Sequence, residues 1–161
     1  MQIKSSAIAT IFENRQRRWR EIGDRVSRLA QALSDHGLGR GDRIAVLMLN
    51  QDRYIECYLC ASWAVAVIVP LDIRRSIREN ADALSDCGAK LLVVARAFTN
   101  AGTTLAANVA GGIGLVYADD GIVPDAMLAY ETMIASQGAT RHGRSDLRPR
   151  RCRHDGLLES S

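Results

Sequence analysis

The chain has 161 residues, of which 47% are hydrophobic and 24% charged, a composition typical of one soluble globular domain. This composition excludes a chain that is disordered throughout, and no apolar run reaches the roughly 18 to 20 residues that a membrane-spanning helix requires. The formal net charge is +3, and residues 1–140 carry as many acidic as basic residues, so the whole positive excess lies in residues 141–161.

Cysteine usage indicates a reducing compartment. The chain has 4 Cys and no charged-then-apolar leader at its N-terminus, so the sequence indicates neither a disulfide framework nor a secretory signal. We therefore expect free thiols and a cytoplasmic protein.

The N-terminal pattern predicts a hairpin followed by an amphipathic helix. A short β-branched and aromatic run at residues 8–12 is followed by polar residues 13–16 and a second extended piece at residues 17–19. From residue 20 apolar side chains recur at helical spacing, and Gly37 should end this helix because glycine adopts the left-handed conformation without a Cβ clash. The expected apolar stripe consists of Ile22, Val26, Leu29, Ala30 and Leu33.

Two strand-and-helix units follow. Residues 43–49 predict a buried strand, and Asn50 is placed to cap a helix that runs to residue 63 or 64. Residues 66–69 predict a strand covered on both faces. Ser76 and Glu79 have capping-box spacing for a second helix, which should end at Gly88. The expected apolar stripes are Tyr54, Ile55, Tyr58 and Leu59 in the first helix, and Ile77, Ala81, Leu84 and Cys87 in the second.

The remaining pattern completes an alternating series. It predicts strands at residues 90–95 and 113–117, a weak helix at residues 104–109, and a last helix at residues 125–136 capped by Asp125. Strand and helix alternate four times, which is typical of a parallel sheet with right-handed crossovers. The predicted fold class is therefore α/β, a partial Rossmann-like parallel sheet with flanking helices and an N-terminal β-hairpin.

The residue types that could carry chemistry form no recognisable site. Cys57 and Cys60 fall in the middle of a predicted helix on its buried side, without a second pair or a His at ligand spacing, so we interpret them as core residues. Cys152 and His154 are two potential ligands where a structural zinc site needs four. No triad-like arrangement surrounds the three histidines, which are His36, His142 and His154.

Two glycine-containing segments have the spacing of nucleotide-binding loops in the wrong context. Residues 138–145 have Walker A spacing with Arg144 in place of the Lys, but a predicted helix, and not a strand, precedes them. Residues 110–114 precede a strand instead of following one, so we interpret them as a helix stop and not as a dinucleotide turn. The sequence assigns no catalytic, cofactor-binding or metal-binding residue.

Several segments in a fixed order carry a more specific signal. They include Arg18-Trp-Arg-Glu-Ile22, residues 24–33, and Gly37-Leu-Gly-Arg-Gly-Asp-Arg-Ile-Ala-Val46. A second block contains Tyr54-Ile-Glu-Cys-Tyr-Leu59, Trp63-Ala64, Ala66-Val-Ile-Val-Pro-Leu71, Ile73-Arg74, Glu79-Asn80 and Ala83-Leu-Ser-Asp-Cys-Gly88. Over residues 8–136 the chain closely resembles the opening of the adenylate-forming acyl-CoA synthetase family, particularly bacterial fatty-acid and related acyl-CoA ligases.

The resemblance implies ATP-dependent activation of a fatty or other carboxylic acid to an acyl-adenylate, followed by thioester formation with coenzyme A. A complete member would use ATP, Mg and CoA. The family's phosphate loop ending in Pro-Lys-Gly, its adenine and ribose pocket with a key Asp, and its C-terminal adenylation Lys come later in the sequence. We therefore expect a truncated fragment that is inactive alone and binds no cofactor of its own. Two departures from the family pattern concern the fold: Val65 stands in place of Gly, and Asp72 in place of a common Asn.

The C-terminal residues form a segment of their own. Residues 141–161 are Arg-rich and lack helix or strand periodicity, which indicates a disordered tail beyond a partial N-terminal domain at residues 1–140. An out-of-frame reading of GC-rich DNA would produce such a change, and residues 154–159 read one base later can encode Thr-Thr-Gly-Phe-x-Lys, compatible with the family's phosphate loop. Residues 148–153 could attract phosphates, but the tail has no aromatic residue to stack a base, which argues against nucleic acid.

Two other functions remain open. The first is a non-catalytic module that binds a partner or nucleic acid through the basic tail, and a salt-dependent association lost on deleting residues 141–161 would support it. The second is a free-standing Rossmann-type nucleotide binder, for which the glycine fingerprint is missing. A sheet taken from a larger domain would also expose an edge, so we expect possible self-association or aggregation.

Overall fold

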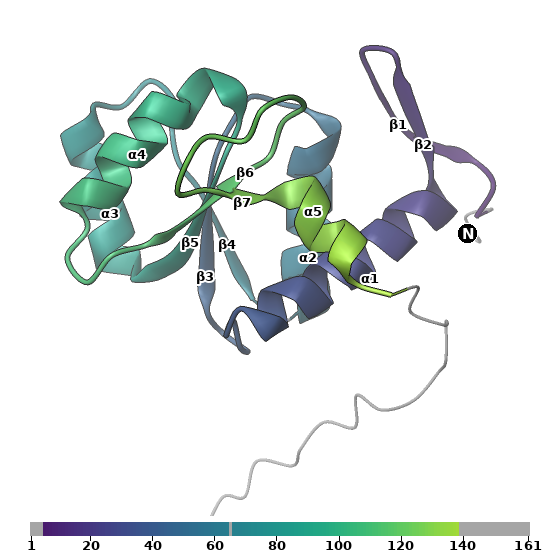
Figure 1. Ribbon diagram of the computed structural model, residues 1–161, viewed down its shortest axis with the longest axis horizontal. Helices are drawn as coiled ribbons and strands as arrows, with labels where there is room; N and C mark the ends of the chain where they lie inside the picture. Colours follow the sequence, from purple (N-terminus) through teal and green to yellow (C-terminus); the bar gives the residue numbers. More distant parts are fainter. Residues whose placement is uncertain (1–4, 65, 139–161) are drawn as a thin grey trace, which may run out of the picture.

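The computed structural model describes residues 5–64 and 66–138. They form an antiparallel hairpin and a five-stranded parallel sheet with helices on both faces, which confirms the predicted α/β class (Figure 1). None of the described helices is long and apolar enough to cross a membrane. The elements are β1 (Ile8–Phe12), β2 (Arg15–Arg18), α1 (Trp19–Asp35), β3 (Arg43–Leu47), α2 (Asp52–Ala64), β4 (Val67–Pro70), α3 (Ile77–Cys87), β5 (Ala89–Val94), the 3₁₀ turn η1 (Arg96–Phe98), α4 (Thr99–Asn108), β6 (Gly114–Tyr117), β7 (Leu128–Ala129) and α5 (Tyr130–Ser136).

The hairpin and the first helix both form, but the second strand is Arg15–Arg18 and not residues 17–19, and the helix begins at Trp19. β1 and β2 pair in antiparallel register, with Phe12 opposite Arg15. The backbone N–H of Arg18 donates to Glu21 Oε2 at 2.6 Å, which satisfies a free amide at the start of α1. All five residues of the predicted apolar stripe are buried, and Gly37 follows the helix with a left-handed φ of 81°. Figure 1 shows the hairpin projecting from the N-terminal end of α1, away from α3 and α4.

The strand order in the sheet is β4-β3-β5-β6-β7, and every neighbouring pair is parallel. The chain moves from β3 to β4 on one side and then crosses back to β5 on the other, so β3 and β5 flank the point where the order reverses. Carboxyl ends of strands at such a point form the usual ligand crevice of open α/β sheets.

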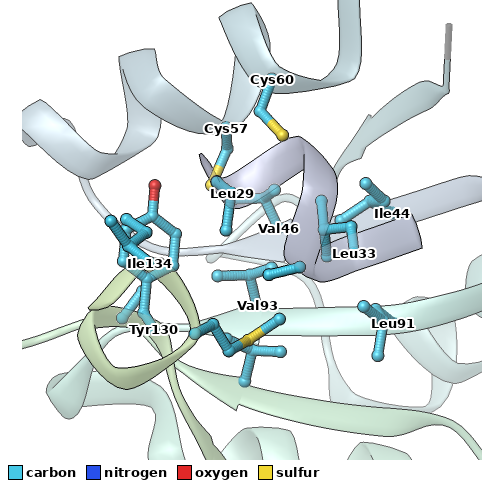
Figure 2. Packing of buried hydrophobic residues seen from close by; sticks show 14 of the residues in the cluster. Leu29, Leu33, Ile44, Val46, Cys57, Cys60, Leu91, Val93, Tyr130 and Ile134 are labelled. Atoms are coloured by element: carbon cyan, nitrogen blue, oxygen red, sulfur yellow. The ribbon is translucent and has the colours of Figure 1, made fainter. Parts of the chain in front are cut away.

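The two faces of the sheet carry separate hydrophobic clusters. On one face, α1, α2 and α5 pack over β3, β5 and β6, and Figure 2 shows side chains of this cluster. On the other face, Ala81 and Leu84 of α3 and Leu105 of α4 join Ala45, Leu47, Leu92 and Val94 of the strands. Successive side chains of β3 and β5 point to opposite faces of the sheet and pack into one cluster or the other, as expected for strands covered on both sides.

The C-terminal part of the sheet differs from the prediction. The expected helix at residues 125–136 is wrong in its first part, because Ala126 has a left-handed φ of 64° and Leu128–Ala129 pairs with β6 as strand β7. The helix begins only at Tyr130, so Asp125 does not cap it. The helix expected at residues 104–109 begins earlier, at Thr99.

The strand β4 was expected to be covered on both faces, and it is only partly covered: Ile68 packs against one hydrophobic cluster and Val69 against the other. β4 is the edge strand of the described sheet and pairs with β3 alone. Val67 is 48% exposed, and Ile68 and Val69 are half-buried. Hydrophobic composition alone does not distinguish an edge strand from a central one, and here the position in the sheet decides the exposure.

Replacing Gly102 by Ala should destabilise the protein. A Cβ at Gly102 would lie 2.7 Å from Val94 Cγ1, and Val94 is fully buried with a stiff, β-branched side chain. We expect the free energy of unfolding to fall by about 1–3 kcal/mol, although Ala favours helices over Gly by about 1 kcal/mol. Gly23→Ala in α1 is the matched control, since nothing lies within 4 Å of its Cβ position, and it should be neutral or stabilising in the same urea titration. Equal effects of the two substitutions would contradict the close contact.

Candidate functional site

Four arginines and four carboxylates come together where the hairpin and three helices meet the loop after β6. The hydrogen-bonded pairs are separated by 31 to 106 residues in sequence, so only the tertiary fold assembles them. We call this group the ion network. Its members are Arg15 and Arg17 of β2, Arg25 of α1, Asp52, Arg53 and Glu56 of α2, Asp120 of the loop after β6, and Glu131 of α5.

Glu56 lies at the centre of the ion network, and its side chain is fully buried. Arg25 donates to both carboxylate oxygens, at 2.7 Å and 3.0 Å, and Arg17 donates to Oε1. The hydroxyl of Tyr130, itself buried, donates to Oε2 at 3.0 Å. Two guanidinium groups and one phenol therefore compensate the buried charge, which is the condition under which a buried carboxylate is tolerated.

The N-terminal turn of α2 connects this centre to the hairpin and to the loop after β6. Asp52 accepts hydrogen bonds from Arg15 Nε at 2.7 Å and from Arg15 Nη2 at 3.1 Å, and these two bonds hold β2 against the start of α2. Arg53 is 1% exposed and donates to Asp120 at 2.6 Å and to Glu131 at 2.9 Å. The bidentate pair and the short contacts are the strong, charge-assisted kind of hydrogen bond.

Three side chains in or beside the ion network have shifted pKa values. Burial tends to raise the pKa of Glu131, but hydrogen bonds from two arginines outweigh burial, so its pKa lies below the usual range. The hydrogen bond from Arg53 is the main cause that lowers the pKa of Asp120. Burial raises the pKa of Tyr130 well above its usual value. Each of these shifts moves the group away from neutral pH, so none of them is prepared for general acid–base catalysis.

The orientation of α2 is the largest correction to the sequence analysis. Half of the predicted apolar stripe does not face the core: Ile55 is 45% exposed and Tyr58 is 39% exposed, while Tyr54 and Leu59 are half-buried and pack against the core cluster. The helix also begins at Asp52, so Asn50 stands two residues before it and is exposed. The ion network is the physical reason. It provides oppositely charged partners for the charged residues on the buried side of α2, and this places Ile55 and Tyr58 on the exposed side. The buried residues of α2 are Asp52, Arg53, Glu56, Cys57, Cys60 and Ala61.

Cys57 and Cys60 are buried, as expected for core residues. Figure 2 shows both side chains extending from α2 into the hydrophobic cluster, near Leu29 and Tyr130. A cavity of about 10 Å³ beside them holds at most one water molecule. Among the described residues, no group of three or more His, Cys, Asp or Glu side chains is arranged to hold a metal ion.

The two buried thiols should resist alkylation in the native protein. Burial raises the pKa of the Cys60 thiol to about 12 and also raises that of Cys57, and only the thiolate reacts readily. Cys87 is half-buried and provides the internal comparison. After brief treatment with iodoacetamide at pH 8, peptide mapping should find Cys87 alkylated at least tenfold more than Cys57 or Cys60. Comparable alkylation of all three would contradict their placement.

The structure places the other residues considered in the sequence at separate positions. His36 follows α1, where its Nδ1 lies 2.8 Å from the carbonyl oxygen of Ala32. Helix α4 ends at Asn108, and Gly111 and Gly112 adopt left-handed φ values of 87° and 79° in the turn that leads to β6 at Gly114. Asp72 accepts from the backbone N–H of Arg74 at 2.9 Å. Val65, His142, Cys152, His154 and the segments 139–145 and 148–153 lie outside the described residues.

Two open hollows lie near the carboxyl ends of the strands. One, of about 440 Å³, separates β1 from the start of α2 and has Ile11, Phe12 and Ile55 among its walls. The other, of about 300 Å³, lies between the ends of β5 and β6 beside Arg96. The side chain of Arg96 hydrogen-bonds Tyr117 Oη at 3.2 Å, and its backbone N–H donates to Asp119 at 3.1 Å, so this arginine already has partners.

Comparison with known proteins decides the family. The family described as AMP-binding enzyme matches residues 2–150. The chain belongs to the AMP-binding enzyme family. This match confirms the resemblance found in the sequence.

Several curated relatives of this chain are named as CoA ligases or synthases. Feruloyl-CoA synthase of Amycolatopsis sp is 41% identical over 73 residues, which cover 45% of this chain and 15% of that protein. The 3-hydroxybenzoate–CoA/4-hydroxybenzoate–CoA ligase of Thauera aromatica is 26% identical over 132 residues, which cover 82% of this chain and 25% of that protein. This chain therefore spans a quarter or less of the length of these two relatives.

Solved structures of the family share the fold. The anthranilate CoA ligase AuaEII, in complex with anthranoyl-AMP, has a TM-score of 0.78 at 19% identity, with 84% of this chain and 26% of that chain covered. A benzoate CoA ligase from Burkholderia xenovorans LB400 has a TM-score of 0.75 at 20% identity, with 88% and 28% covered. In these two solved structures the matching sheet, helices and hairpin make up about a quarter of the chain.

Proposed function

We propose that this chain supplies the first part of the large domain of a ligase that joins a carboxylic acid to coenzyme A through an acyl-adenylate. The family match over residues 2–150 carries the proposal. It is supported by several curated relatives that are named as CoA ligases or synthases, and by the shared fold. In this role the described residues build a rigid layer behind the chemistry and do not carry it.

Aromatic acids are the substrate class we propose to test first. The sequence resemblance suggested fatty-acid ligases, and a structural neighbour from Mycobacterium tuberculosis is a fatty acyl CoA synthetase. The names of the curated relatives, however, refer to ferulate, hydroxybenzoate and 2-succinylbenzoate. These relatives favour an aromatic carboxylic acid, with long-chain fatty acids as the comparison.

ATP, Mg and CoA are the cofactors we propose for the complete enzyme. A structural neighbour, the O-succinylbenzoate coenzyme A synthetase of Bacillus subtilis, was solved in complex with ATP and a magnesium ion. The residues of the present structure do not fit these ligands by themselves. Within residues 5–64 and 66–138 the arginines of the ion network are bonded to carboxylates, and no acidic cluster is arranged for a metal.

We also propose that residues 1–140 are the partial domain and that residues 141–161 are a separate basic segment, read out of frame. A shifted reading frame that continues into the family's phosphate loop would support this, and a gene without such a frame would count against it. For location we propose the cytoplasm, supported by three free thiols among the described residues.

The experiment is an assay of purified residues 1–161. The chain is incubated with ATP, Mg²⁺, CoA and either 4-hydroxybenzoate, ferulate or palmitate, and pyrophosphate and acyl-CoA are measured. The Thauera aromatica ligase serves as the positive control with 4-hydroxybenzoate. We expect no product above the blank for this chain with any acid. Acyl-CoA formed by the chain alone would overturn the proposal that it lacks the catalytic parts.

A further inference from the structure

The hairpin of β1 and β2 makes little apolar contact with the rest of the protein. Among residues 8–18, all of which the structure describes, Ala9 alone packs against a hydrophobic cluster. Ile8 and Ile11 of β1 are instead 49% and 66% exposed. The open hollow of about 440 Å³ lies between β1 and the start of α2, so side chains do not fill the space between these two elements. Apolar burial therefore supplies little of the free energy that holds the hairpin in place.

Ion pairs hold the hairpin against the body of the protein. Arg15 of β2 donates to Asp52 at 2.7 Å and to Asp120 at 3.1 Å. Arg17, also of β2, has Nη1 3.1 Å from Asp52 and donates to Glu56. The side chain of Arg15 is 28% exposed, so solvent reaches one end of this contact. Two guanidinium groups of one strand therefore make the main contact between the hairpin and α2.

Backbone hydrogen bonds fix the base of the hairpin. The N–H of Trp19 donates to the carbonyl oxygen of Ala7 at 3.1 Å, and the N–H of Arg20 donates to that of Ser5 at 3.0 Å. These bonds tie the residues before β1 to the first turn of α1. Arg15 acts at the other end, next to the turn at residues 13–14. Loss of its ion pairs would free the outer part of the hairpin while the base stays attached.

One buried hydroxyl opposes the closed position of the hairpin. Thr10 of β1 is 9% exposed and lies at the wall of the hollow. Its Oγ1 is buried and has no hydrogen-bond partner among the described residues. A buried hydroxyl without a partner costs free energy, which is recovered when the hydroxyl reaches water. The closed position thus gains ion pairs and loses the hydration of one hydroxyl.

We propose that the hairpin, residues 8–18, is a strap that the ion pairs of Arg15 and Arg17 hold closed and that opens from the start of α2 while the sheet stays folded. Opening uncovers Thr10 and the hollow beside it. A two-stranded hairpin without tertiary contacts is marginally stable in water, so the amides of the open strap exchange with solvent. The proposal concerns this chain alone and does not depend on the proposed function.

Hydrogen–deuterium exchange of purified residues 1–161, followed by mass spectrometry, tests the proposal. Arg15→Gln should accelerate exchange in residues 8–18 at least tenfold, because it removes the ion pairs with Asp52 and Asp120. Thr10→Val should slow the same exchange at least threefold, because it removes the hydroxyl that the closed strap leaves without a partner. In both variants, exchange in β5 should stay within twofold of the unmodified chain. Arg20→Gln, the same change at an exposed position, is the matched control and should leave residues 8–18 unchanged.

Cysteine labelling measures opening at the buried position itself. Thr10→Cys nearly conserves the size of the side chain, and Ile11→Cys places a thiol at the next residue, which is exposed. With N-ethylmaleimide, position 10 should react at least tenfold more slowly than position 11. Addition of Arg15→Gln should accelerate the reaction at position 10 at least fivefold and leave position 11 within twofold. Peptide mapping separates both sites from the native Cys87.

Three results would overturn the proposal. Exchange that rises equally in residues 8–18 and in β5 of the Arg15→Gln variant would mean that the hairpin opens only when the whole chain unfolds. Unchanged exchange in residues 8–18 of this variant would mean that the ion pairs do not hold the strap. Faster exchange in the Thr10→Val variant would mean that the hydroxyl stabilises the closed position.

Discussion

Glu56→Gln lowers the free energy of unfolding by about 3–5 kcal/mol, the cost expected when one partner of a buried ion pair is removed. The substitution keeps the shape of the side chain and removes its charge. Arg17 and Arg25, whose side chains are 11% and 17% exposed, then lose a charged partner, and Arg25 loses a bidentate one. The Gln amide nitrogen also replaces one acceptor that now receives hydrogen bonds from Arg25 and the Tyr130 hydroxyl.

Urea denaturation followed by circular dichroism measures this loss. Glu13→Gln is the matched control: Glu13 is exposed in the hairpin turn, and the same change there should alter stability by less than about 0.5 kcal/mol. A loss below about 1 kcal/mol for Glu56→Gln would mean that water, and not the two guanidinium groups, compensates the carboxylate.

Leu84→Ala produces the second large effect, a loss of about 2–5 kcal/mol in the free energy of unfolding. Leu84 is fully buried in α3, in the cluster that contains Leu92 of β5 and Leu105 of α4. Removal of its side chain beyond Cβ leaves a cavity in the face of the sheet opposite the ion network. The cost combines the lost transfer free energy of the methyl groups with the cavity that the surrounding helices fail to fill.

The control for this prediction is Ile122→Ala. The same number of carbon atoms is removed, but Ile122 is 94% exposed, so stability should change by less than about 0.5 kcal/mol. Thermal unfolding and urea titration should agree on the ranking of the two variants. An equal loss of stability in the Leu84→Ala and Ile122→Ala variants would contradict the burial of Leu84 of α3 and the exposure of Ile122 in the loop after β6.

Where local signals and tertiary packing agree, the sequence alone predicts the structure correctly. The stripe of α1 is buried as its spacing indicates, and the capping box of α3 forms, with Ser76 N–H donating to Glu79 at 2.9 Å. Gly88 ends α3 with a left-handed φ of 59°. Each of these features depends on residues at most a few positions apart, and for this reason a periodic pattern or a cap can reveal them.

Where an element's bounds or exposure depend on residues far away in the sequence, the sequence alone does not predict them. The start of α5 depends on the pairing of Leu128–Ala129 with β6, which no local pattern announces. The exposure of β4 depends on its place at the edge of the sheet. A run of β-branched residues is compatible with an edge strand and with a central one, so the position cannot be read from the residue types.

The ion network shows the same limit for the candidate site. Charged residues at helical spacing normally indicate a solvated face, whereas Asp52 and Glu56 lie on the buried side of α2. Their arginine partners stand 31 to 39 residues away in the hairpin and α1, and Tyr130 stands 74 residues from Glu56, so no spacing rule connects them. The cysteines on the same side of α2 were assigned correctly to the core, and they were the local signal that α2 is turned this way.

The orientation of α2 is the central claim, because the ion network depends on it. Hydroxyl-radical footprinting of the dilute, monomeric chain tests it directly by comparing two tyrosines of equal intrinsic reactivity. Tyr58 is 39% exposed and Tyr130 is 1% exposed, so we expect Tyr58 to be oxidised at least tenfold faster, with Trp63 modified as well. Protection of Tyr58 and Trp63 in the monomer, or oxidation of Tyr130 at the rate of Tyr58, would contradict the account.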